Sequence, residues 1–236
     1  MKKKKERKKR LSLIKIILPV CILPFCIGLA KALVEQLARV DKLSPQQFYF
    51  MLGFTSYLLL QVIFFKPIRT YIFGHELTHA LWSMLFGGRV KEFSVGKNGG
   101  SVLLTKTNFV VTLAPYFFPL YSVLVIVLYY TIGFFTGLEP YVSYMVYLLG
   151  FTFSFHIALT MNSLTGKQPD LIKTGVFFSL SVIFFINIIV VALVMKLVSP
   201  GSIYLFGFLK RGFGIGIFIY SWTGTYMASV IDKMTG

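Results

Sequence analysis

The stretch TGVFFSLSVIFFINIIVVALVMKL, residues 174–197, decides the fold class of this chain. An α-helix rises 1.5 Å per residue, so about 20 apolar residues cross a bilayer core that is about 30 Å thick. Five more apolar runs of sufficient length lie at 11–33, 47–86, 108–135, 141–162 and 203–228. We therefore predict an all-α polytopic membrane protein with about six transmembrane helices.

The composition excludes other classes of protein. Of the 236 residues, 56% are hydrophobic, only 14% are charged and only eight are acidic. A soluble domain has about a quarter of its residues charged. This chain therefore has too few charged residues to cover a surface that faces only water. The two cysteines, Cys21 and Cys26, are too few for a disulfide scaffold of this length.

The first ten residues, MKKKKERKKR, hold eight Lys or Arg and one Glu, and so carry +7 of the net charge of +16. A basic tail beside an apolar run predicts cytoplasmic anchoring on anionic lipid headgroups rather than nucleic-acid binding. Ala30-Lys31-Ala32 has the shape of a signal-peptide cleavage site, but the apolar stretch before it is longer than a typical signal sequence. We therefore treat 11–33 as a retained first span, and expect the N- and C-termini inside.

The connection 87–107, GGRVKEFSVGKNGGSVLLTKT, differs from the other connections. Alternating apolar and polar residues lead into the glycine-rich turn at 96–100, and β-formers follow it. We predict a β-hairpin here. Its four basic residues favour a cytoplasmic position, provided that 47–86 crosses the membrane once and bends at Pro67.

The sequence His75-Glu76-Leu77-Thr78-His79 is an H-E-x-x-H motif within a predicted helix. Residues i and i+4 share a helix face, so both imidazoles can bind one Zn²⁺, and Glu76 can act as general base toward water. Ionisable groups are costly in apolar helices, which makes a functional role the default interpretation. The alternative is that His75, Glu76 and His79 are hydrogen-bonded polar groups of the core without a catalytic role.

A catalytic zinc site needs a third protein ligand. A metzincin would place a histidine six residues after His79, where this chain has Leu85. Two candidates remain, Asp170 and His156. In one straight helix they would be about 21 Å apart, but Gly166 and Pro169 permit a break.

From about residue 70 to 175, the chain resembles the site-2 protease family of intramembrane zinc metalloproteases, and within it the short bacterial members without PDZ or other accessory domains. His75, Glu76 and His79 match the family's motif, and Asn162 and Asp170 keep the spacing of its second motif. The chain departs from the family where Ala114-Pro115 replaces Gly-Pro, Pro169 is the one proline left in the second motif, and Leu171 replaces a glycine.

The resemblance implies that His75, His79 and Asp170 hold Zn²⁺, with Glu76 catalytic and His156 a supporting or core residue. It also implies a membrane-associated hairpin and a bacterial cytoplasmic membrane. The substrates would be membrane proteins whose transmembrane segments unwind locally. The expected organisation is a tail at 1–10, a span at 11–33, a catalytic core at 47–175 and further helices at 174–236.

Two alternatives stay open. A pseudoprotease would bind metal and grip transmembrane helices without cleaving them. A metal transporter would carry ligands on several spans, whereas here they cluster beside a candidate base. The pair Lys210-Arg211 inside the last apolar run has no explanation at this stage.

Overall fold

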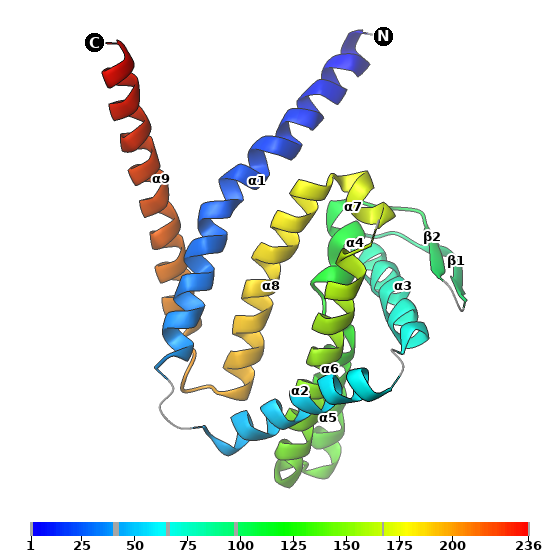
Figure 1. Ribbon diagram of the computed structural model, residues 1–236. Coiled ribbons are helices and arrows are strands. Elements are labelled where there is room, and N and C mark those ends of the chain that lie inside the picture. The colour runs from blue at the N-terminus through cyan, green and yellow to red at the C-terminus, as the bar shows by residue number, and fades with distance from the viewer. Residues whose placement is uncertain (1, 40–42, 65–66, 97–98, 167, 236) are drawn as a thin grey trace. The chain divides into compact units, whose positions relative to one another are not determined.

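The structure is a computed structural model that describes residues 2–39, 43–64, 67–96, 99–166 and 168–235, with side chains from residue 15 onward. Most of this part of the chain is helical, and it contains one two-stranded sheet (Figure 1). The elements are α1 Lys2–Leu37, α2 Pro45–Ile63, α3 Ile68–Leu85, β1 Val90–Val95, β2 Gly100–Leu104, α4 Phe109–Leu113, η1 Ala114–Tyr116, α5 Leu120–Thr136, η2 Glu139–Tyr141, α6 Val142–Leu164, α7 Pro169–Thr174, α8 Val176–Val198 and α9 Leu205–Thr235.

Among the described residues, three helical segments are long and apolar enough to cross a membrane: Lys15–Leu37, Glu139–Leu164 and Val176–Val198. A fourth span is possible if Phe109–Tyr116 and Leu120–Thr136, which meet at 80°, act as one broken segment. The chain thus has the helices of a membrane protein, but the expectation of about six spans is not confirmed. Helices α2, α3 and α9 are not among the candidates.

The predicted run 47–86 forms two helices rather than one bent helix. Helix α2 begins at a capping box, in which Ser44 and Gln47 satisfy each other's backbone N–H groups. It ends at Ile63, and α3 begins after Pro67. Proline has no backbone N–H and disfavours helix in the residue before it, so the chain restarts there. Lys66, which precedes this proline, lies outside the described residues.

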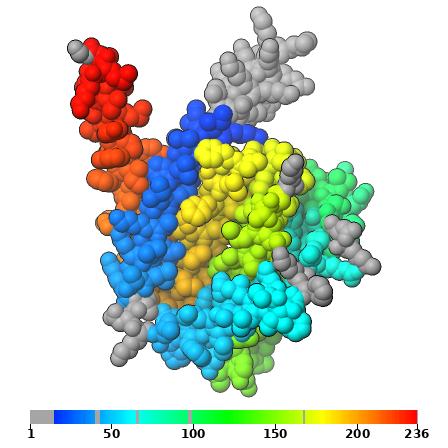
Figure 2. Space-filling model, viewed as in Figure 1, coloured from blue at the N-terminus to red at the C-terminus, as the bar shows by residue number. Residues whose placement is uncertain are grey.

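The chain divides into two compact units, and the first consists of α1, α8 and α9. Within it, α1 and α9 pack at small residues: a Cβ on Gly28 would lie 2.1 Å from the carbonyl oxygen of Gly212 and 2.9 Å from the backbone nitrogen of Gly216. Figure 2 shows the first half of α9 lying against α1. Cys26 is buried in this unit and Cys21 is exposed, both as free thiols.

The second unit runs from α2 to α7. Helix α2 crosses α6 closely, because Gly53 faces the carbonyl of Tyr147 and Gly150 faces the carbonyl of Phe50. An aromatic and aliphatic cluster fills the space beside this crossing, with Tyr57, Phe155 and Leu159 buried at its centre.

The predicted hairpin is present. Strands β1 and β2 are antiparallel, with Phe93 opposite Val102, and a register shift lies between Val90 and Glu92. Lys97 and Asn98, in the predicted turn, lie outside the described residues. Gly100 at the start of β2 is pressed against α3, since a Cβ there would lie 2.6 Å from Cγ2 of Ile72 and 2.7 Å from Cγ of Glu76.

The predicted break between His156 and Asp170 is also present. Helix α6 ends at Leu164, and the short helix α7 begins at Pro169. This break carries Asp170 away from the axis of α6 and presents it to α3.

Candidate metal centre

His75 and His79 lie one turn apart on α3, as their spacing predicts. Their rings make an edge-to-face contact with centroids 4.8 Å apart. Both side chains are largely buried, at 12% and 10% exposure. The two Nε2 atoms therefore face a shared interior position rather than solvent.

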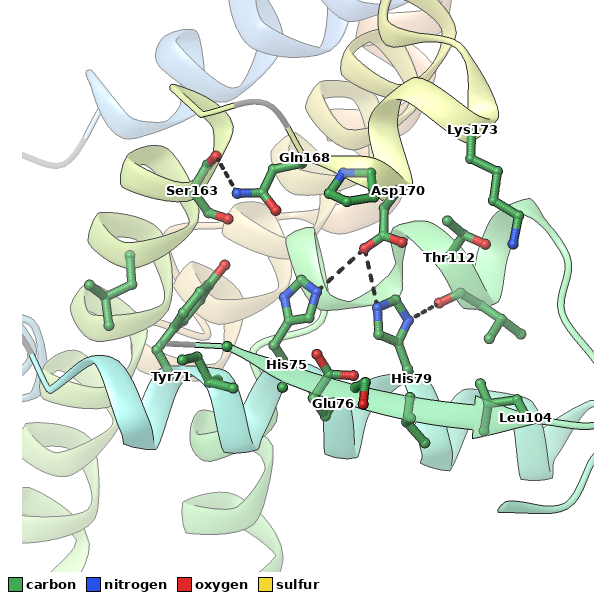
Figure 3. A pocket seen from close by; sticks show the side chains of 18 of the residues that line it. Tyr71, His75, Glu76, His79, Leu104, Thr112, Ser163, Gln168, Asp170 and Lys173 are labelled. Carbon is green, nitrogen blue, oxygen red and sulfur yellow. Dashed lines mark hydrogen bonds and ion pairs between the residues drawn. The ribbon is translucent and has the colours of Figure 1, made fainter. Parts of the chain in front are cut away.

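Asp170 reaches these histidines from α7, although 91 positions separate it from His79 in the sequence. Its Oδ2 lies 3.3 Å from Nε2 of His79 and 3.5 Å from Nε2 of His75. Figure 3 shows the three side chains pointing toward one another, with Glu76 beside them on α3. The donor atoms of His75, His79 and Asp170 all lie within 4.8 Å of one another, so they form a group that could hold a metal ion.

A backbone carbonyl orients His79. Its Nδ1 lies 2.8 Å from the carbonyl oxygen of Val111 on α4. A carbonyl oxygen only accepts hydrogen bonds, so Nδ1 carries the proton and donates it. In the neutral ring this leaves the lone pair on Nε2, the atom that faces Asp170.

The donor set fits a zinc-type cation. An imidazole lone pair and a carboxylate oxygen repel at this separation unless a proton or a metal ion lies between them. Two ligands about 2.0–2.1 Å from Zn²⁺ at a tetrahedral angle are about 3.3 Å apart, close to the two His–Asp distances. Two imidazoles and one carboxylate would also leave a fourth position open for water, as catalytic zinc sites do.

Electrostatics keep Asp170 ionised. Burial raises the pKa of its carboxyl, but when Nε2 of His75 and of His79 carries a proton, their hydrogen bonds and attraction outweigh this and hold the pKa below the usual range for aspartate. A further hydrogen bond comes from the Tyr116 hydroxyl, 3.4 Å from Oδ2. The carboxylate is therefore available as a ligand at neutral pH.

His75 is held by aromatic neighbours. Its ring contacts Tyr71 at 5.8 Å and Tyr116 at 5.3 Å between centroids. Its Nδ1 is buried and has no hydrogen-bond partner among the described residues. Packing, rather than a hydrogen bond to this nitrogen, sets the orientation of the ring.

Glu76 lies next to His75 and is 9% exposed. No ion pair joins it to a basic side chain in the described part of the chain. The close approach of Gly100 fixes strand β2 beside the aliphatic part of this side chain. A buried carboxylate beside the metal ligands has the position that a general base requires.

A pocket of about 570 Å³ opens onto this group. Asn162 and Gln168 line it, and so do residues of β2 and Lys173. Thr78, on α3, is not among the lining residues. It is 1% exposed, and its hydroxyl instead donates to the carbonyl of Gly74 within the same helix, as Thr commonly does in helices.

His156, the alternative third ligand, is not part of the group. It lies buried in α6, and its Nε2 has no hydrogen-bond partner among the described residues. The chain break brings Asp170, not His156, to the histidines of α3.

Sequence reasoning missed two groups at this site, the Val111 carbonyl and the Tyr116 hydroxyl. A backbone carbonyl leaves no trace in residue type, and Tyr116 is one of 13 tyrosines. Its one distinguishing signal is its position directly after Pro115, where α4 gives way to the η1 turn.

Comparison of the chain with protein family models, with curated proteins and with solved structures gave no match.

Proposed function

We propose that this protein is a zinc-dependent endopeptidase of the site-2 protease type, which hydrolyses peptide bonds in or near the transmembrane segments of membrane proteins. The observation that carries the proposal is the meeting of Asp170 with both histidines of H-E-x-x-H, at 3.3 and 3.5 Å, beside Glu76. Two imidazoles, one carboxylate and a neighbouring glutamate form the set that zinc peptidases use.

His75, His79 and Asp170 would hold the zinc. When bound, it would polarise the scissile carbonyl and make water more acidic. The pair of neutral imidazoles with one carboxylate leaves the site with net positive charge once the ion is present. This charge suits the negative charge that develops on the peptide oxygen during hydrolysis.

Glu76 would move the proton. As the water oxygen forms its bond to the carbonyl carbon, the Glu76 carboxylate takes a water proton. The same carboxyl group then gives that proton to the nitrogen as the C–N bond breaks, so the products are a carboxylate and an amine. The burial of Glu76 supports this role, because a carboxylate away from bulk water is a stronger base.

Strand β2 would align the substrate. It pairs with β1 along one edge, and its residues Gly100, Ser101 and Val102 line the pocket at the metal group. An extended peptide could add to the free edge by backbone hydrogen bonds, with little demand on side chains. A substrate helix must unwind locally to do this, which favours transmembrane segments with weak helical stability.

The apolar helices support a membrane location, and we propose a bacterial cytoplasmic membrane with both termini inside. Helices α1 and α9 run antiparallel in the first unit, since Arg211 pairs with Glu35, whereas Tyr220, further along α9, donates to the carbonyl of Cys21, nearer the start of α1 (Figure 1). This arrangement puts the two chain ends on the same side of that unit. The basic residues of 1–10 favour the side with anionic headgroups.

The proposal is tested by cleavage of a panel of tagged single-span substrates in liposomes. Wild type is compared with Glu76→Gln and Asp170→Ala, and bound zinc is measured on the same samples. We expect Glu76→Gln to abolish cleavage and keep zinc, and Asp170→Ala to lose both. Thr225→Ala on α9 is a control, since this exposed side chain donates within its own helix.

Zinc binding without any cleavage by wild type would replace the protease with a metal-dependent binding protein. Zinc uptake into sealed liposomes by wild type and by Glu76→Gln alike would indicate a transporter. Undiminished zinc in Asp170→Ala would contradict the ligand set itself.

A further inference from the structure

A second pocket lies in the first unit, away from the metal group. It has a volume of about 600 Å³ and is formed by α1 and α9. Its lining includes three cationic side chains, Lys31, Lys210 and Arg211, and an apolar part around Ile215 and Phe218.

The cationic end is fixed by one ion pair. The Arg211 guanidinium donates from Nε to Oε2 of Glu35 at 3.0 Å and from Nη2 to Oε1 at 3.2 Å. A guanidinium has five N–H donors, so this pairing leaves three for another acceptor. Glu35 thus anchors Arg211 at the pocket without using up its hydrogen-bonding capacity.

Lys31 and Lys210 add two ammonium groups to this pocket. Neither forms an ion pair with a carboxylate in the part of the chain that the structure describes. Among the described residues, Glu35 thus pairs with one of the three cations, Arg211, and the pocket keeps an excess of positive charge. Like charges gathered at one place repel, unless an anion shares them.

The rest of the pocket is apolar and points toward the middle of a span. Helices α1 and α9 are antiparallel, so the direction from Arg211 to Phe218 leads from the end of the Lys15–Leu37 segment toward its centre. Gly214 lies along this path, and a Cβ added to it would have no heavy atom within 4 Å. The pocket therefore has a cationic end near the limit of the apolar segment and an open apolar groove beyond it.

We propose that this pocket binds an anionic phospholipid, with its phosphate between Lys31, Lys210 and Arg211 and an acyl chain along Gly214, Ile215 and Phe218. Lysine binds phosphate as a point charge and arginine binds it through paired N–H donors. A phosphate on an acyl chain matches both ends of the pocket, whereas free phosphate matches one. The proposal also accounts for the cost of Lys210 and Arg211 in an apolar run, because a bound anion compensates their charge.

The test is native mass spectrometry of the full-length protein in detergent, titrated with palmitoyl-oleoyl phosphatidylglycerol. Wild type is compared with the double variant Lys31→Gln, Lys210→Gln. Arg211 is left unchanged, because its loss would also leave Glu35 unpaired. Lys233→Gln is the matched control, since Lys233 is an exposed lysine in the last turn of the same helix.

All variants keep the basic tail, so lipid held by the tail is common to them. We expect the double variant to bind the first phosphatidylglycerol about 25-fold more weakly than wild type, and the control to bind like wild type. Helix content and bound zinc should match in all three proteins, which separates lipid binding from folding and from the metal group.

Two outcomes would overturn the proposal. Equal affinity of the double variant and wild type would show that the pocket does not hold the lipid. Displacement of phosphatidylglycerol by millimolar inorganic phosphate, with the same dependence on Lys31 and Lys210, would make this a site for free phosphate.

Discussion

The hydroxyl of Tyr116 donates a hydrogen bond of 3.4 Å to Oδ2 of Asp170, the same oxygen that faces Nε2 of His75 and His79. Tyr116 is completely buried, and its ring also packs edge-to-face on His75. One side chain from the η1 turn thus holds a carboxylate of α7 and an imidazole of α3. Groups that orient metal ligands in this way affect metal affinity without touching the ion.

Tyr116→Phe should weaken zinc binding by about tenfold, because it removes a hydrogen bond to Asp170 and keeps the ring packing. Competition with a zinc chelator measures this directly. Tyr129→Phe is the matched control, since it loses a hydrogen bond of 2.8 Å to the carbonyl of Leu138 outside the site. Equal zinc affinity in the two variants would exclude a role for Tyr116 in orienting Asp170.

The spacing of H-E-x-x-H was enough to predict that His75 and His79 share a helix face, because that relation is local. The approach of Asp170 is not local. From the residues alone both Asp170 and His156 remained candidates, and the resemblance to a protease family favoured Asp170. The deciding feature is the chain break at Gly166 and Pro169. These residue types indicate that the helix ends there, but they do not indicate in which direction the chain continues.

The fold shows a similar division. The apolar runs at 141–162 and 174–197 predicted helices that are found, and the glycine-rich connection predicted the hairpin. The apolar run 47–86 suggested one span bent at Pro67, whereas the structure has two separate helices there, α2 and α3. Average hydrophobicity hides such a break, which depends on Pro67 and on where each helix packs.

Zinc affinity should decrease as the pH falls, with two protons competing for the site. The pKa of Asp170 is held below its usual range, so this carboxyl stays ionised where an exposed aspartate, with a pKa of about 3.9, would begin to take up protons. Competition then comes from the two imidazoles, because a nitrogen that carries a proton cannot bind a metal ion. Equilibrium dialysis should show a loss of affinity of about 100-fold per pH unit once both nitrogens take up a proton.

A loss of about 1000-fold per unit would mean that a third proton binds, and that Asp170 is not kept ionised. In the metal-free protein, the lowered pKa of Asp170 also determines how the stability of the fold changes with pH. A folded pKa below the unfolded one stabilises the fold above about pH 4, and this stabilisation is lost as the pH falls through the folded pKa. Asp170→Asn should remove that part of the acid dependence in a denaturation series.

Gly100→Ala should reduce cleavage about tenfold or more and leave zinc affinity within about twofold. The new Cβ would lie 2.6 Å from Cγ2 of Ile72 and 2.7 Å from Cγ of Glu76, so Glu76 or strand β2 must shift. The three atoms nearest to the new Cβ belong to Ile72, Glu76 and Ser94, and none of these is a metal ligand. Gly99→Ala is the control, since a Cβ there meets no atom within 4 Å. Similar activity of both variants would argue against the alignment of Glu76 by β2.

Gly28→Ala should lower the free energy of unfolding of the first unit by about 1–3 kcal/mol, and with it the melting temperature. The reason is that overpacked helix contacts cannot relax easily. Its Cβ would lie 2.1 Å from the backbone oxygen of Gly212, and backbone moves less readily than a side chain.

The control is Gly224→Ala on α9, where an added Cβ has no atom within 4 Å. Alanine is the better helix former by about 1 kcal/mol, so this variant should melt slightly higher than wild type. Thermal unfolding in detergent, followed by circular dichroism, measures both melting temperatures. If α1 and α9 touch at Gly28, the melting temperature falls for Gly28→Ala and rises for Gly224→Ala. A rise in melting temperature for both variants would show that the two helices do not meet there.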